Sequence, residues 1–280
     1  RGIARMELGK IDGAISDFDQ AVLHMPGSAA AYTARGIARA TQNRLYHAID
    51  DYRQAAVLAP EDPQVENNLG VALYRNGRTA EAVEAFDRAL TLDDSYASAR
   101  LNRGIARVQQ GDASGAMTDF TAALESNPTL ARARLERASL AFDSGDFAAA
   151  ASDFTEAAAQ EPDRASEWLL WAHVASRRAG ADPDASSLVV PGALNSPWPR
   201  LFVDLFRGEV TGDEVAAALE SFSGAAEAEA AFFLGEHLLL SEEEAGAVEL
   251  FRRAILDGDV SSYAYAGARS ELRRLGYLTE

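Results

Sequence analysis

A 34-residue repeat limits the fold of this chain more than any other feature of its sequence. The pentapeptide Arg-Gly-Ile-Ala-Arg stands at residues 1–5, 35–39 and 103–107, and a glycine recurs every 34 residues. Each unit then carries an alanine, an aromatic residue, a second alanine and a closing proline, and Asp94 replaces that proline once. The first three columns are Gly2, Gly36, Gly70 and Gly104; Ala14, Ala48, Ala82, Ala116 and Ala150; and Phe18, Tyr52, Phe86, Phe120 and Phe154. Small residues let helix backbones approach closely, and proline ends a helix, so each unit is predicted to be two packed helices.

Glycine, alanine, aromatic, alanine and proline in this order, at this period, resemble the tetratricopeptide repeat. The resemblance implies an all-α chain, a solenoid in which helix pairs stack into a right-handed superhelix. One pair cannot bury its own apolar face, so neighbouring pairs must stack and both ends need a cap.

We expect three regions along the chain. Residues 1–178 form the repeat array, with a partial first unit, four full units and one extra first helix. Residues 179–226 form an irregular, proline-rich junction with short helices, because four prolines fall between Pro183 and Pro199. Residues 227–280 form a C-terminal repeat-like helix pair, with Gly235 and Phe251 in the repeat positions, followed by a capping helix.

Arginine and aspartate form a second pair of columns. In four units an arginine precedes the glycine position and an aspartate follows 16 residues later; where Leu69 replaces the arginine, Ala85 replaces the aspartate. The pairs are Arg1 with Asp17, Arg35 with Asp51, Arg103 with Asp119, and Arg137 with Asp153. Joint presence and joint absence predict an ion pair between the two helices of a unit. Drift in composition is the alternative explanation.

Two apolar segments need a covering partner. The first helix begins at Arg1 with Ile3, Met6 and Leu8, and we expect another chain to cover it, as in a homodimer, or its end to fray. The segment 198–206 is very apolar and too short to be a stable helix alone. We expect it to dock on the extra first helix that carries Trp168 and Trp171, joining the array to the C-terminal pair as one rigid body; an exposed docking site is the alternative.

The composition and the motifs disfavour several classes of function. A net charge of −17 argues against binding to nucleic acid, and the lack of cysteine excludes disulfides and thiolate metal sites. No apolar run reaches the roughly 20 residues of a membrane span. The four histidines form no metal-binding pattern, and no nucleophile motif occurs. We therefore expect no catalytic, cofactor-binding or metal-binding residue, no cofactor and no enzymatic activity.

The candidate binding surface is the concave face formed by the first helices. The frame places on it Thr33, Ile37, Asn67, Val71, Tyr74, Arg75, Leu101, Asn102, Ile105, Gln109, Leu135, Phe142, His173 and Arg177. Tyr74 and Phe142 are candidate anchors for a partner protein or peptide, and the Asn67 and Asn102 amides could bind its backbone. Ordinary packing between neighbouring first helices is the alternative for the apolar positions.

From about residue 166 onward the layout resembles the bacterial lipoprotein family of NlpI. The matching features are Glu167-Trp168-Leu169, the segment from Trp198 to Gly208 followed by Thr211, the run from Phe232 to Glu236, and the run from Ala247 to Ala254. This resemblance implies a periplasmic adaptor anchored to the outer membrane, commonly dimeric, that brings peptidoglycan hydrolases to a processing protease. A lipid anchor would then lie upstream of Arg1. A cytoplasmic assembly or chaperone-type scaffold, and a regulatory domain of a larger enzyme, remain alternatives.

Overall fold

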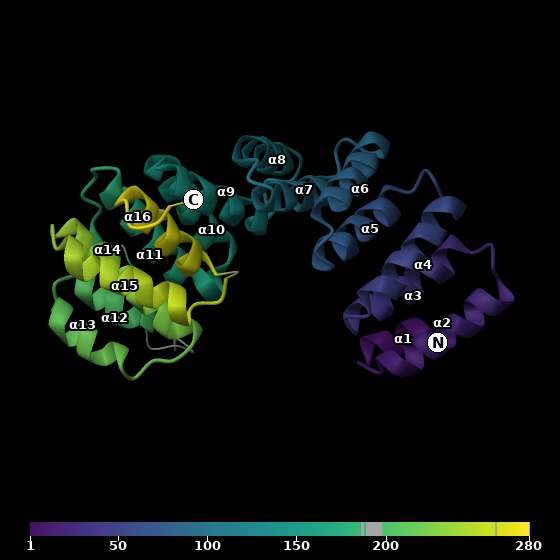
Figure 1. Cartoon of the computed structure of the whole chain (residues 1–280), viewed down its shortest axis with the longest axis horizontal. Helices are drawn as coiled ribbons and strands as arrows, with labels where there is room; N and C mark the ends of the chain where they lie inside the picture. Colours follow the sequence, from purple (N-terminus) through teal and green to yellow (C-terminus); the bar gives the residue numbers. More distant parts are fainter. Residues whose placement is uncertain (186–187, 189–197, 261, 280) are drawn as a thin grey trace. The chain divides into compact units, whose positions relative to one another are not determined.

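The computed structural model describes residues 1–185, 188, 198–260 and 262–279, and every regular element within these residues is a helix (Figure 1). The chain divides into two compact units, Arg1–Pro128 (unit 1) and Thr129–Glu280 (unit 2). The all-α fold of paired repeat helices is therefore confirmed. The division after Pro128 differs from the expected boundary after residue 178, because the helices that follow Thr129 pack with the C-terminal helices.

Unit 1 consists of four consecutive helix pairs. They are α1 (Gly2–Glu7) with α2 (Ile11–His24), α3 (Ala29–Thr41) with α4 (Leu45–Leu58), α5 (Pro63–Arg75) with α6 (Thr79–Leu92), and α7 (Ala97–Gln109) with α8 (Ala113–Ser126). The turn between the two helices of a pair contains a residue in the left-handed backbone conformation, such as Gly77 with φ +79° or Asn43 with φ 59°. Glycine and asparagine tolerate this conformation better than other residues.

The glycine and aromatic columns meet inside each pair. A Cβ atom added to Gly36 would lie 2.8 Å from Cε1 of Tyr52, and one added to Gly70 would lie 2.5 Å from Cε1 of Phe86. Both distances are shorter than a van der Waals contact. The aromatic ring of the second helix thus lies directly on the backbone of the first, so the 16-residue spacing fixes how the two helices pack.

The predicted ion pairs between the two helices of a repeat are confirmed in all four repeats that carry them. Arg35 Nη2 lies 2.7 Å from Asp51 Oδ1, Arg103 Nη2 lies 2.6 Å from Asp119 Oδ1, and Arg137 Nε lies 2.8 Å from Asp153 Oδ2. Arg1 Nε donates to Asp17 Oδ1 at 2.8 Å. In the α5–α6 repeat, which lacks these charges, Leu69 and Ala85 are buried in the apolar core.

The pentapeptide contributes a second arginine to the same aspartate, a contact that was not among those predicted. Arg39 Nη1 lies 2.8 Å from Asp51 Oδ2, and Arg107 Nη1 lies 2.8 Å from Asp119 Oδ2. The first arginine also reaches the preceding pair, because Arg35 Nη1 lies 2.9 Å from Asp19 Oδ1. The Arg35 and Arg103 repeats are therefore connected both internally and to the preceding pair, since Arg103 Nη1 likewise lies 2.6 Å from Asp87 Oδ1.

Unit 2 begins with two further first helices and the helix between them. These are α9 (Ala131–Ser144), α10 (Phe147–Gln160) and, after the short η1 (Pro162–Arg164), α11 (Ala165–Arg178). The C-terminal part consists of α12 (Trp198–Phe206), α13 (Gly212–Leu219), α14 (Ala225–Leu240), α15 (Glu244–Asp257) and α16 (Tyr263–Arg274). The pair formed by α14 and α15 repeats the glycine–aromatic contact, since a Cβ atom on Gly235 would lie 2.7 Å from Phe251 Cε1.

The short helix α12 docks on α11, as expected. It contacts His173 there, and not Trp168 or Trp171. Phe202 is buried 5.7 Å from the ring of Phe233 on α14, and the Phe206 ring lies 4.7 Å from His173 on α11. The two tryptophans face elsewhere. Trp171 stacks on Phe232 of α14 at 4.6 Å, and Trp168 packs edge-on against Tyr263 of α16 at 5.6 Å. Helices α14 and α16, and not α12, therefore pack against the two tryptophans.

The capping helix α16 does more than close the final pair. Besides packing on α14 and α15, it lies against α9, far earlier in the chain (Figure 1). Ser270 Oγ and Arg274 Nη2 each donate to the carbonyl oxygen of Asp143 at 3.1 Å. These bonds join positions about 130 residues apart in sequence, and they explain why α9 belongs to unit 2.

Candidate functional site

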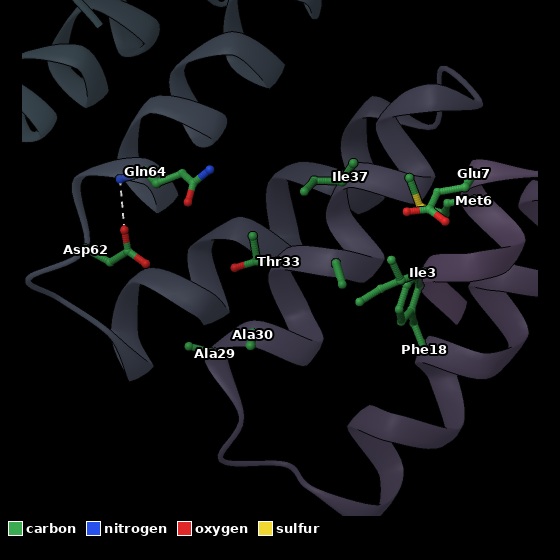
Figure 2. Close-up of a pocket in the computed structure, with 11 residues that line it drawn as sticks. Ile3, Met6, Glu7, Phe18, Ala29, Ala30, Thr33, Ile37, Asp62 and Gln64 are labelled. Atoms are coloured by element: carbon green, nitrogen blue, oxygen red, sulfur yellow. Dashed lines mark hydrogen bonds between the residues drawn. The ribbon is translucent and has the colours of Figure 1, made fainter. Parts of the chain in front are cut away.

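An apolar groove opens on the first helices of unit 1. Its cavity has a volume of about 770 Å³, within the range of about 300–1,000 Å³ common for ligand pockets. Figure 2 shows its lining side chains, which are Ile3, Met6, Glu7, Phe18, Ala29, Ala30, Thr33, Ala34, Ile37, Asp62 and Gln64. They come from α1, α2, α3 and the start of α5.

The helix-pair packing directs these side chains into the groove. On α3, Gly36 and Ala38 are buried, so Ile37 between them points away from the core. Ile37 is 39% exposed and Ile3, one period earlier, is 66% exposed. Thr33 lies one turn before Ile37 and shares its face. The repeat pattern therefore places Ile3 and Ile37 on the same exposed face.

Two of the predicted binding residues in unit 1 line the groove. The others lie on the next first helices, α5 and α7. Thr33 and Ile37 line the groove. Val71, Tyr74, Asn102 and Ile105 are half-buried, Arg75 and Gln109 are exposed, and Asn67 and Leu101 are buried.

The two predicted backbone-binding amides bind each other. Asn102 Nδ2 donates to Asn67 Oδ1 at 2.9 Å, and Asn67 is buried. This hydrogen bond joins two neighbouring first helices. The two amides therefore contribute to the contact between neighbouring repeats.

The predicted residues in unit 2 are mostly core residues. Phe142 is 1% exposed, and its ring packs edge-on against Phe147 at 5.1 Å and Trp171 at 5.5 Å. Leu135 and His173 are also buried, and Arg177 is half-buried. Burial lowers the pKa of His173 to about 4. The prediction that Phe142 anchors a partner is wrong, because the protein's own aromatic residues already surround it.

Several groove residues were absent from the predicted set. They are Ile3, Met6, Glu7, Phe18, Ala29, Ala30, Ala34, Asp62 and Gln64. The sequence did contain a signal for the first two, because Ile3 occupies the repeat position of Ile37 and Met6 that of Val108. The alanines also line the groove, and a 34-residue frame does not distinguish them from core alanines.

The described residues contain no candidate metal site. Among them, no group of three or more histidine, cysteine, aspartate or glutamate side chains is arranged to hold a metal ion. Within the same residues, no helix is both long and apolar enough to span a membrane.

Comparison with known proteins identifies the family. The tetratricopeptide repeat model matches residues 1–64, 67–131 and 135–185, more than half of the chain. The chain therefore belongs to the tetratricopeptide repeat family, whose members typically serve as non-catalytic modules of protein interaction and use concave surfaces for binding. No curated protein matches the chain.

Solved structures share the fold. A tetratricopeptide repeat protein from Parabacteroides merdae is 17% identical, with 97% of this chain and 96% of that chain covered and a TM-score of 0.58. PilW, a widely conserved type IV pilus biogenesis factor, is 24% identical over 64% of this chain and 83% of its own, with a TM-score of 0.57. YrrB, a tetratricopeptide repeat protein with an unusual peptide-binding site, is 20% identical over 63% and 88%, with a TM-score of 0.50.

Proposed function

We propose that this chain is a non-enzymatic adaptor that holds a segment of a partner protein in the unit 1 groove. One observation carries the proposal: Ile3 and Ile37, which share one repeat position, are exposed and line a cavity of about 770 Å³. Exposed apolar surface of this kind marks binding sites in soluble proteins. The unusual peptide-binding site of YrrB is consistent with such a use of the fold.

Selection from a phage-displayed random peptide library tests this proposal. The test variants are Ile3→Asp and Ile37→Asp, which place a charge in the groove. The matched control is Val57→Asp, which changes an exposed apolar residue of α4 outside the groove. We expect selected peptides to bind the wild type and Val57→Asp equally, and to lose at least about tenfold in affinity, about 1.4 kcal/mol, on the groove variants. Selected peptides that bind all four proteins equally would contradict the proposal.

We further propose that the adaptor works in the bacterial cell envelope, as NlpI-like proteins do when they bring peptidoglycan hydrolases and a processing protease together. The order of features after residue 166 supports this location. The fold shared with a pilus biogenesis factor is compatible with it. Fractionation of cells that express the full-length gene tests it: recovery with the periplasm or outer membrane is expected. Recovery with the cytoplasm would favour a cytoplasmic scaffold instead.

A further inference from the structure

Two carboxylates without cationic partners lie at opposite ends of the groove. Glu7 belongs to α1 and Asp62 precedes α5, and Figure 2 shows them on either side of Thr33 and Ile37. Neither forms an ion pair with any residue that the structure describes. Asp62 Oδ1 accepts a hydrogen bond from the Gln64 backbone at 2.9 Å as the cap of α5.

The arginines of α1 and α3 do not compensate these two charges. Arg5 Nη1 lies 3.0 Å from Asp17 Oδ2, and Arg39 Nη1 lies 2.8 Å from Asp51 Oδ2. Arg35 is held between Asp51 and Asp19. Each guanidinium is therefore bound to aspartates of the second helices and not to Glu7 or Asp62, so the groove has at each end a carboxylate without an ion-pair partner among the described residues.

An apolar groove with an acidic group at each end fits a ligand of complementary pattern. We propose that the partner segment is a stretch of polypeptide with apolar side chains in the middle and a lysine or arginine on each side. The apolar side chains contact Ile3, Met6 and Ile37, and the flanking cations face Glu7 and Asp62. This inference rests on the proposed adaptor function and specifies the chemistry of its partner.

The charge of the chain favours a basic partner over a second copy of itself. With 26 lysines and arginines against 43 acidic residues, the net charge is −17. Two such chains repel each other at low ionic strength, whereas a basic segment is attracted and oriented. A second copy seated in the groove is therefore an outcome that the test must distinguish.

Two short fluorescent peptides with the same leucine- and alanine-containing core test the inference. One carries lysine at both ends, and the other carries glutamate. We expect the lysine peptide to bind the wild type about tenfold more tightly at low salt, and the double variant Glu7→Gln/Asp62→Asn to reduce this ratio at least about threefold. Asparagine retains the capping ability of Asp62, so α5 keeps its N-terminal hydrogen bond.

The matched control is the double variant Glu84→Gln/Glu125→Gln. It removes two exposed carboxylates from α6 and α8, outside the groove, and changes the net charge by the same amount. We expect this control to retain the wild-type preference. In about 0.5 M salt the difference between the two peptides should shrink for every protein, because the Debye length falls below about 5 Å.

Three results would overturn the inference. The first is equal binding of both peptides by the wild type. The second is an equal loss of preference in both double variants, which would assign it to net charge alone. The third is concentration-dependent dimerisation that Ile37→Asp abolishes, which would place a second copy in the groove. Binding that does not depend on Ile37 at all would instead contradict the proposed adaptor function.

Discussion

Two repeat positions are exposed in unit 1 and buried in unit 2. Val108 on α7 is 45% exposed, whereas Phe142, one period later on α9, is buried. Ile37 on α3 lines the groove, whereas His173 on α11, four periods later, is buried against Phe206. A position in the repeat frame therefore fixes the direction of a side chain, but not whether anything covers it.

The C-terminal helices provide the cover in unit 2. Phe232 of α14 lies 6.2 Å from the Phe142 ring, and the Arg274 guanidinium of α16 lies 5.7 Å from it. Within unit 2, α14 and α16 thus fill the face of α9 and α11, whereas Ile37 and Val108 of unit 1 are partly exposed. This contrast supports assigning partner binding to unit 1.

The two units also differ in how deeply their ion pairs are buried. Arg178 of α11 lies between two carboxylates with no exposed surface, at 3.0 Å from Glu236 Oε2 and 2.9 Å from Glu271 Oε2. Burial raises the pKa of Glu236, although Arg178 opposes the shift. Because buried ion pairs specify geometry more than they stabilise, we interpret this cluster as fixing the position of α14 and α16 on α11.

Removing the shared arginine should have the largest effect. We expect Arg178→Met to lower the free energy of unfolding by about 4 kcal/mol, because it leaves the buried Glu236 without its ion-pair partner, whereas Glu271 keeps its contact with Arg274. The corresponding change in unit 1, Arg35→Met, should cost about 1 kcal/mol, since Arg39 still pairs with Asp51. Urea unfolding measures both. Equal losses would show that the two charge networks do not differ as described.

The next largest effect compares one repeat position in the two units. Phe142→Ala should cost about 3 kcal/mol, because it creates a cavity among buried rings. Val108→Ala should stay within about 0.5 kcal/mol of the wild type, because Val108 is half exposed. Thermal and urea unfolding of the two variants test this. A loss for Val108→Ala as large as that for Phe142→Ala would mean that the face of unit 1 is covered in solution.

Removing the ring that covers His173 should expose this repeat position in unit 2, as it is exposed at Ile37 in unit 1. Phe206→Ala removes the ring that lies 4.7 Å from His173, and we expect a loss of about 2 kcal/mol. The pKa of His173, about 4 in the wild type, should rise toward its ordinary value because water reaches the imidazole. NMR titration measures this shift. An unchanged pKa would show that other residues of unit 2, and not α12, keep His173 dry.

The smallest effect concerns a half-buried acid of α14. Burial, and secondly the nearby Glu167, raise the pKa of Glu229 to about 7 from the ordinary 4.5. The native state then binds more protons than the unfolded state between these values, so wild-type stability falls as pH rises from about 4.5 through 7. Glu229→Gln removes this loss, and we expect it to be more stable than the wild type by about 1 kcal/mol at about pH 8 and equal at about pH 4.

Urea unfolding at several pH values measures this difference. The control is Glu84→Gln, which changes an exposed carboxylate of unit 1 and should follow the wild type at every pH. A constant difference between Glu229→Gln and the wild type across the range would contradict the raised pKa.

Contacts within one repeat unit could be predicted from the sequence. The ring of Tyr52 on Gly36 and the pairing of Arg35 with Asp51 both follow from a spacing of 16 residues, which the repeat shows several times. Part of the groove could be inferred in the same way, since Ile37 shares its column with Ile3. The second arginine of the pentapeptide was visible too, but its partner became evident only when the two helices were placed together.

The sequence by itself determined the family, the helix pairs, their ion-pair columns and the direction of each first-helix side chain. These features depend on short spacings that recur, and recurrence makes a local rule visible. Only the tertiary structure decided which first helices stay open. That outcome depends on single long-range contacts, such as Arg274 with the carbonyl of Asp143, 131 residues away. No periodic pattern encodes a contact that occurs once, so the exposure of Ile37 and the burial of Phe142 emerged only from the packed chain.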